Sequence, residues 1–418
     1  MFTRIRSYER SVQLLLLNQL TINVGFYMLM PYLAGHLADD LGMAAWTVGL
    51  VLGMRNLSQQ GLFLIGGTLA DRLGYKPVIV AGCVLRTGGF ALLGLVDTLP
   101  ALLVASAATG FAGALFNPAV RAYLACDAAD RRVEAFAVFN VFYQAGILAG
   151  PLIGLALVTV DFRLVCGVAA AVFAVLTLVQ LRWLPPRRAA APVEAGVLAD
   201  WRTVLANRPF LLFACAMAGS YVLSFQIYLL LPLMLQRHLG GRAGGALGGV
   251  SLIFVVSAVT AIAGQLRITD WARRRWDAPA AITRGLLLMA VSFLPLVGYG
   301  LTAHGTAGPV ALLAAVVLCT LLLALGSALS FPFEMDTVVR LSAGRLVATH
   351  YGLYNTIAGI GIAAGNLLSG TLLDTAGSGP LPWIVLTVLG AACATALHLL
   401  ARYGRLEVAA EPRQEAAL

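Results

Sequence analysis

The sequence predicts an all-α polytopic membrane protein with twelve transmembrane helices in two pseudo-symmetric six-helix bundles. Of its 418 residues, 60% are hydrophobic and 11% are charged, whereas soluble domains are about 45 to 50% apolar and about 25% charged. Apolar runs of the roughly 20 residues that a helix needs to cross a bilayer recur twelve times along the chain. Helix-breaking residues also recur at similar spacing in the two halves of the sequence.

The apolar runs fall into two groups of six. The first group covers residues 12–36, 46–69, 77–96, 100–124, 134–160 and 163–183, and the second covers 210–235, 246–268, 280–302, 309–331, 347–373 and 382–401. The stretch between the groups is rich in proline and charge, which is typical of a linker. We therefore expect an N-terminal bundle at 1–184, a cytoplasmic linker at 185–208, a C-terminal bundle at 209–403 and a cytoplasmic tail at 404–418.

The two halves resemble each other. Pro118 precedes Gly150 by 32 residues, and Pro332 precedes Gly365 by 33. This similar spacing indicates a six-helix duplication. Parallel repeats of this kind, related by an axis along the membrane normal, place a substrate site between the halves near the midplane.

Positive charge predicts the orientation. If both termini are cytoplasmic, only Arg163, Arg237 and Arg242 of the 28 basic residues fall in the outer loops, as the positive-inside rule requires. The basic residues are scattered among short loops rather than gathered on one face, so the net charge of +9 is not interpreted as a nucleic-acid footprint. One lysine among 28 basic residues, with abundant alanine, suggests a high-G+C bacterium and hence the bacterial plasma (inner) membrane.

The clearest local pattern lies between the second and third spans. It runs from Gly67 through Asp71, Arg72, Gly74 and Lys76 to Pro77. A helix dipole disfavours a carboxylate at a helix C-terminus, so Asp71 needs a basic neighbour or the N-terminus of another helix. The simpler interpretation is a tight turn with charges that only set topology. The second half keeps Asp270 and Arg273 but has Leu266 at the position of the glycine.

The fifth span carries glycines four residues apart on one helical face, which allows two helix backbones to pack closely. The pattern is Gly146, Gly150, Pro151 and Gly154. The proline permits a bend in the helix. The alternative is a generic interface of small residues.

Over nearly its whole length the chain resembles the major facilitator superfamily, and within it the twelve-helix drug:H+ antiporter family and the group of multidrug resistance protein MdtH. The resemblance rests on the loop pattern at 67–77, on 53–61, on 85–90 and on 161–166. It implies that Asp71, Arg72 and Lys76 form a gating latch that stabilises the outward-facing state. The glycines of the fifth span, with Pro151, resemble the antiporter motif of proton-coupled exporters, although Val138 and Leu155 stand where that motif prefers glycine.

Charges inside a membrane are costly unless they are paired or line a wet cavity, so they point to function. We expect Arg121 to pair with Glu334 or Asp336 and so to close the cytoplasmic side; the alternative is that all three lie in loop water. With the tenth span ending at 331, no acid lies deep in any span. The candidates for the substrate or proton pathway are Asn18, Asn23, Tyr27, Arg55, Arg86, Arg121, Glu134, Gln144, Gln226, Glu334, Asp336 and Asn355, with His36 and His350 as further proton carriers.

The expected function is proton-coupled export of amphipathic small organic compounds, either drugs or an endogenous metabolite, by alternating access. Two alternatives remain open: an importer of a small solute on the same fold, and a non-transporting membrane sensor or scaffold. An enzyme is not expected, because the sequence contains no metal-spaced His/Cys cluster, phosphate loop or nucleophile motif. The expected partners are the substrate, protons and the lipid bilayer, with no cofactor, metal or nucleic acid, and a monomer is expected.

Overall fold

A computed structural model describes residues 2–188, 196–239, 245–302, 308–376 and 379–406. These residues form helices and short connections, and no strand occurs among them. Ten segments of this part of the chain are long and apolar enough to cross a membrane.

The helices follow one another as α1 (Phe2–Arg6), α2 (Arg10–Gly35), α3 (Ala45–Leu73), α4 (Tyr75–Leu95), α5 (Leu99–Ala128), α6 (Arg132–Val158), α7 (Phe162–Trp183), α8 (Val197–Ala206), α9 (Arg208–Phe225), α10 (Leu230–Leu239), α11 (Gly245–Arg275), α12 (Ala278–Val291), α13 (Leu294–Thr302), α14 (Pro309–Leu341), α15 (Val347–Ala376) and α16 (Leu381–Arg402). A π-helical turn, His36–Asp40, extends α2, and a 3-10 turn, Ala129–Arg131, joins α5 to α6.

The twelve predicted spans are confirmed. One apolar segment, Leu99–Val158, contains both α5 and α6. The second span, α3, is not among the ten apolar segments, because it carries Arg55, Gln59 and Gln60. It nevertheless packs between α5 and α15. The seventh and ninth spans differ from the expected single helices, because each is broken, into α9 and α10 and into α12 and α13.

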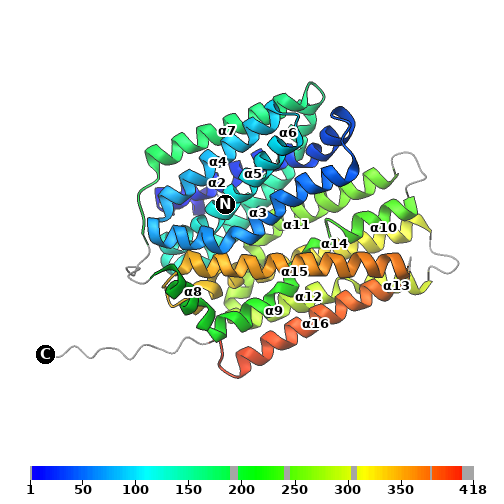
Figure 1. Cartoon of the computed structure of the whole chain (residues 1–418). Helices are drawn as coiled ribbons and strands as arrows, with labels where there is room; N and C mark the ends of the chain where they lie inside the picture. The colour runs from blue at the N-terminus through cyan, green and yellow to red at the C-terminus, as the bar shows by residue number, and fades with distance from the viewer. Residues whose placement is uncertain (1, 189–195, 240–244, 303–307, 377–378, 407–418) are drawn as a thin grey trace.

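The helices form two six-helix bundles that contact each other and enclose a cavity between them. Figure 1 shows α2 to α7, blue to green, above the helices of the second half, green to red. Contacts between the halves run from α3 to α15 and from α6 to α11 and α14. The α3–α15 contact is backbone to backbone: a Cβ built on Gly67 would lie 2.1 Å from the carbonyl oxygen of Ala348.

The predicted linker contains a helix that the sequence pattern did not predict. Helix α8 has its own polar contacts with the end of α3, and Figure 1 shows it beside the start of α15. We call this end of the molecule, where α8, the C-terminus of α3 and the N-terminus of α15 lie, the linker end. The predicted tail falls mostly on residues 407–418, outside the described residues.

Candidate functional site

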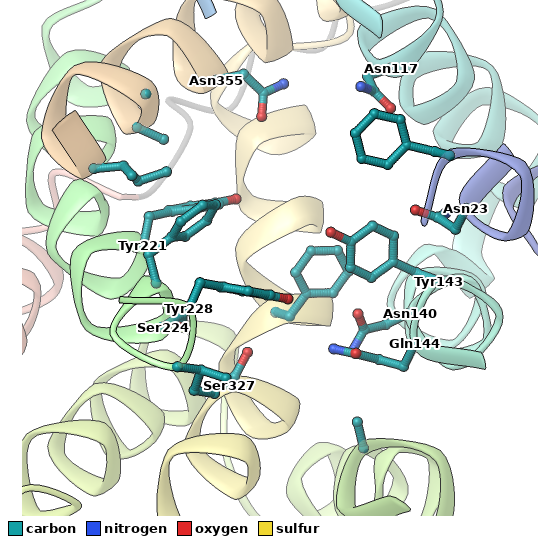
Figure 2. Close-up of a pocket in the computed structure, with 18 of the residues that line it drawn as sticks. Asn23, Asn117, Asn140, Tyr143, Gln144, Tyr221, Ser224, Tyr228, Ser327 and Asn355 are labelled. Atoms are coloured by element: carbon teal, nitrogen blue, oxygen red, sulfur yellow. The ribbon is translucent and has the colours of Figure 1, made fainter. Parts of the chain in front are cut away.

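A cavity of about 550 Å³ lies between the two bundles. Its walls come from α2 to α6 in the first half and from α9, α11, α12, α14 and α15 in the second. Figure 2 shows the polar groups of the two walls, with Asn23, Asn117, Asn140, Tyr143 and Gln144 on one side and Tyr221, Ser224, Tyr228, Ser327 and Asn355 on the other. A volume of this size suits a small organic molecule.

Most of the predicted pathway residues line this cavity. They are Asn23, Tyr27, Arg55, Arg86, Arg121, Gln144, Glu334 and Asn355. The others do not. The amide oxygen of Asn18 accepts a hydrogen bond from Gln180 at 2.8 Å, which joins α2 to α7. Gln226 donates to the carbonyl of Val222, four residues earlier, at 2.8 Å.

Glu334 corrects the expectation that no acid lies deep in a span. Helix α14 continues to Leu341, ten residues beyond the predicted end at 331, and the glutamate side chain is only 3% exposed. Its carboxylate accepts a hydrogen bond from the hydroxyl of Tyr354, and the positive charge of Arg121 acts on it. The sequence pattern predicts too early an end for this span, because Glu334 and Asp336 interrupt the apolar run.

Arg121 has a different partner from the one expected. Its guanidinium donates to the amide oxygen of Asn355 at 2.7 Å and so joins α5 to α15. No ion pair of Arg121 occurs among the described residues. Asp336 instead pairs with Arg132 of α6 at 2.7 Å. Asp336 therefore does form a charge pair with the first half, but its partner is an arginine of α6 and not the expected Arg121 of α5.

The carboxylate of Asp71 lies at the N-terminus of α15. It accepts hydrogen bonds from the backbone N–H groups of Ala348 at 3.1 Å and Thr349 at 2.7 Å, and from the Thr349 hydroxyl at 2.7 Å. Of the partners that the sequence left open, the structure selects the N-terminus of another helix, whose dipole favours a negative charge. Asp71 is 4% exposed, so the contact is sheltered from water.

The basic residues of the same loop contact the linker helix α8 and the end of α7. Arg72 pairs with Asp200 of α8 at 2.6 Å, and Lys76 donates to the carbonyl of Leu181 at 2.9 Å. Gly74 turns the chain with φ of 93°, a conformation that favours glycine. Trp201 of α8 donates to the hydroxyl of Thr68 at 2.9 Å. The loop therefore holds both α15 and α8 against α3.

The second-half counterpart of the loop is less elaborate. Asp270 accepts a hydrogen bond from Arg4 at 2.7 Å, and this bond raises the pKa of the Arg4 guanidinium above its ordinary value. Arg273 lies near enough to Tyr8 for its charge to act on the tyrosine hydroxyl. Glu134 is paired with Arg131 at 3.1 Å beside Tyr8 and does not line the cavity.

The glycine face of α6 packs against α2. A Cβ built on Gly154 would lie 2.0 Å from the carbonyl oxygen of Met28, and a Cβ on Gly146 or Gly150 would lie 2.5 Å from the Cβ of Asn23 or 2.8 Å from the Cβ of Tyr27. The carbonyl of Pro151 accepts a hydrogen bond from Tyr32 at 2.7 Å. This glycine pattern thus holds two helices of the same bundle together.

The two histidines have local partners. His36 lies 2.7 Å from the carboxylate of Asp40 and stacks on Phe162, and His350 lies 2.8 Å from the carbonyl of Leu346. Neither lines the cavity.

The sequence reasoning missed two features of the contact between the halves. One is the buried hydrogen bond of 2.7 Å that Asn140 of α6 donates to Gln265 of α11. The other is Asp200. Amides inside apolar spans were the available signal for the first, whereas an acid in a polar linker gave no signal.

Comparisons with known proteins agree with this architecture. An uncharacterized MFS-type transporter of Mycobacterium tuberculosis is 55% identical over 373 residues, which cover 89% of this chain and 88% of that protein. The multidrug resistance protein MdtH of Yersinia pestis is 30% identical over 399 residues, 94% of this chain and 95% of that one. The crystal structure of the human organic anion transporter MFSD10 matches with a TM-score of 0.69 at 18% identity, over 93% of this chain and 99% of that chain, which is a likeness of fold.

The expected resemblance to the MdtH group is thereby confirmed. Residues 15–365 match the family model of the Major Facilitator Superfamily. The chain belongs to the Major Facilitator Superfamily.

Proposed function

We propose that this transporter exports amphipathic small organic compounds in exchange for protons, by alternating access. The observation that supports it most directly is Glu334. Among the described residues that line the cavity, it is the one carboxylic acid, and its side chain is buried where a substrate would bind. A buried ionisable group inside a membrane protein marks an ion or proton pathway.

The contacts around Glu334 suggest how a proton is coupled to the movement of the halves. The carboxylate on α14 accepts from Tyr354 on α15 and attracts Arg121 on α5, which is itself bonded to Asn355 on α15. Protonation removes the negative charge and weakens both attractions. The hold of α5 on α14 and α15 then loosens, and the linker end can open.

In this mechanism the closed linker end faces the cytoplasm, because the basic residues are concentrated in the loops on the side of the termini. The closed state is held by Asp71 at the N-terminus of α15, by Arg132 and Asp336, and by Asn140 and Gln265. A proton that enters from outside reaches Glu334 and favours opening toward the cytoplasm. The substrate binds there as the proton leaves, and the charged site then closes again.

Export is favoured over import by the glycine pattern of α6 and by the relatives of the MdtH group, whose name is multidrug resistance protein. A non-transporting sensor is disfavoured because the cavity and the contacts that close one end are both present. We propose the bacterial plasma membrane as the location, both termini in the cytoplasm, and a monomer as the working unit.

The test is fluorescence of a pH-sensitive dye in everted vesicles with an imposed proton gradient. A panel of cationic, neutral and anionic amphipathic compounds is added to wild type and to Glu334→Gln. We expect at least one compound to collapse the gradient in wild type and none to do so in Glu334→Gln. The control is Glu134→Gln, which removes an acid that is paired with Arg131 outside the cavity. Proton release that persists in Glu334→Gln would refute the role of this carboxylate, and its absence from wild type would refute proton-coupled export.

A further inference from the structure

Two arginines from the first bundle line the cavity on the same side. Arg55 comes from α3 and Arg86 from α4. Both guanidiniums lie beside one aromatic ring, with their Cζ atoms 4.4 and 5.2 Å from the centroid of Phe26. Because both lie against the same ring, the two guanidiniums are close together, and their like charges repel each other.

Neither charge is neutralised by the protein. Arg55 donates to the amide oxygens of Asn56 and Gln59, at 2.8 and 2.7 Å, and Arg86 donates to the backbone carbonyl of Thr109 at 3.0 Å. All these acceptors are uncharged. Neither arginine forms an ion pair with any residue that the structure describes. The Nε atoms of both are buried and have no hydrogen-bond acceptor.

The burial of these groups makes the missing counter-charge costly. Arg86 is 3% exposed, and Arg55 is partly buried. Unpaired charges inside a membrane protein are strongly disfavoured unless a partner or a wet cavity compensates them. The rings of Phe26 and Phe116, the latter 4.6 Å from the Arg86 Cζ, supply some compensation by cation–π attraction. An aromatic face does not, however, accept the in-plane N–H groups that remain without partners.

The whole cavity carries an excess of positive charge. Its charged lining residues, within the described part of the chain, are Arg55, Arg86, Arg121 and Glu334. The glutamate and Arg121 act on each other, which leaves the two arginines of the first bundle as the uncompensated charges. Phe26, Phe116 and Phe139 lie on the same wall and offer apolar contact area next to them.

We propose that Arg55 and Arg86 form a binding site for the anionic group of the substrate, so that the transported compounds are amphipathic organic acids. A carboxylate, sulfonate or phosphate group accepts hydrogen bonds from guanidinium N–H groups in well-matched geometry. The apolar body of the same molecule lies against the aromatic wall. This inference rests on the proposed transport function and narrows its substrate class. The counter-charge that the protein lacks is then supplied by the molecule it carries.

The experiment compares an acid with its neutral isostere. The probes are 1-naphthaleneacetate and 1-naphthaleneacetamide, which have the same apolar body and nearly the same shape. Their binding to the full-length transporter in lipid nanodiscs is measured by titration calorimetry near neutral pH. We expect the acid to bind about tenfold or more tightly than the amide, because hydrogen bonds to charged groups contribute more than neutral ones.

Variants of Arg55 and Arg86 test whether these two residues cause the preference for the acid over the amide. In Arg55→Gln and in Arg86→Gln the acid and the amide should bind with similar affinity, while binding of the amide changes little. The matched control is Arg284→Gln, because the Arg284 Cζ also lies against an aromatic ring, 4.2 Å from the centroid of Trp276, but does not line the cavity. This control should keep the preference of wild type.

Equal affinities of the acid and the amide for wild type would overturn the proposal, and so would a preference that survives in both glutamine variants. The wild-type comparison and Arg55→Gln leave Arg86 in place, so they test the proposal even if loss of the buried Arg86 prevents folding. Proton release with neutral or cationic compounds but no acid preference would refute the anion site and leave export intact. An acid preference without any proton release would refute proton coupling and leave the anion site standing.

Discussion

The carboxylate of Asp71 at the end of α3 accepts two hydrogen bonds from Thr349, one from its backbone N–H and one from its hydroxyl, both at 2.7 Å. These residues belong to opposite halves of the transporter. The bond therefore joins the two halves at the linker end, where the dipole of α15 favours the negative charge of Asp71. It forms only while the two helix ends meet, so it stabilises one conformation selectively.

Replacement of Asp71 by asparagine should shift the protein toward the state that is open at the linker end. The charge is lost, and with it hydrogen bonds to a charged acceptor that contribute about 1.5 to 3 kcal/mol each. We expect the closed state to lose about tenfold or more in population. The measurement is labelling of a cysteine placed at Ser327 in the cavity by an impermeant maleimide added from the linker end, in a background without native cysteines.

The control for this variant is Asp97→Asn, which removes an acid paired with Arg163 at 3.0 Å on an exposed surface. Its labelling should match that of wild type. If Asp71→Asn is labelled no faster than Asp97→Asn, the carboxylate does not stabilise the closed end.

Gly67→Ala should prevent the linker end from closing. A Cβ at this position would lie 2.1 Å from the carbonyl oxygen of Ala348, and the contact is backbone, which cannot move aside as a side chain can. Gly61→Ala on the same helix is the matched control, because a Cβ there meets nothing within 4 Å. In the same labelling assay Gly67→Ala should react faster than wild type, and Gly61→Ala should not. Equal rates would mean that α3 and α15 need not approach this closely.

Exchanging charges should distinguish the roles of Arg132 and Arg121 at the contact between the halves. Arg132 and Asp336 form an ion pair at 2.7 Å, so transport lost in Arg132→Asp or Asp336→Arg should recover in the double variant. The exchange of Arg121 with Glu334 should not recover transport. Arg121 donates to Asn355 and Glu334 accepts from Tyr354, so the exchanged side chains would each lose their hydrogen-bond partner. Dye-detected proton release measures both. Recovery in the second pair but not the first would reverse the assignment.

The contact between Arg72 and Asp200 should tie α8 to the first bundle. Two nitrogens of Arg72 donate to one oxygen of Asp200, at 2.6 and 2.8 Å, and Asp200 is buried. We expect Asp200→Asn to lower the free energy of unfolding by about 1.5 to 3 kcal/mol, because the hydrogen bonds of Arg72 to a charged acceptor are lost. Thermal unfolding in detergent, with the exposed Asp130→Asn as control, measures this. An unchanged midpoint would show that α8 contributes little to stability.

The sequence by itself determined the membrane class, the twelve spans and the positions of the breakers. These properties are local, since about 20 apolar residues must form a helix in a bilayer whatever their neighbours are. The pattern at 67–77 also identified Asp71 as a carboxylate in need of a partner, because the helix dipole acts within a single helix.

Only the tertiary structure decided which partners those charges have. Three features depend on how α3, α5, α6, α14 and α15 pack: the contact of Asp71 with the N-terminus of α15, that of Asp336 with Arg132 rather than Arg121, and the burial of Glu334. A sequence shows that a charge lies in or near a span, but the distance to a counter-charge on another helix is set by packing between helices far apart in the chain. For the same reason, the sequence does not show that Arg55 of α3 and Arg86 of α4 lie together without a counter-charge. Their proximity depends on both helices packing next to Phe26.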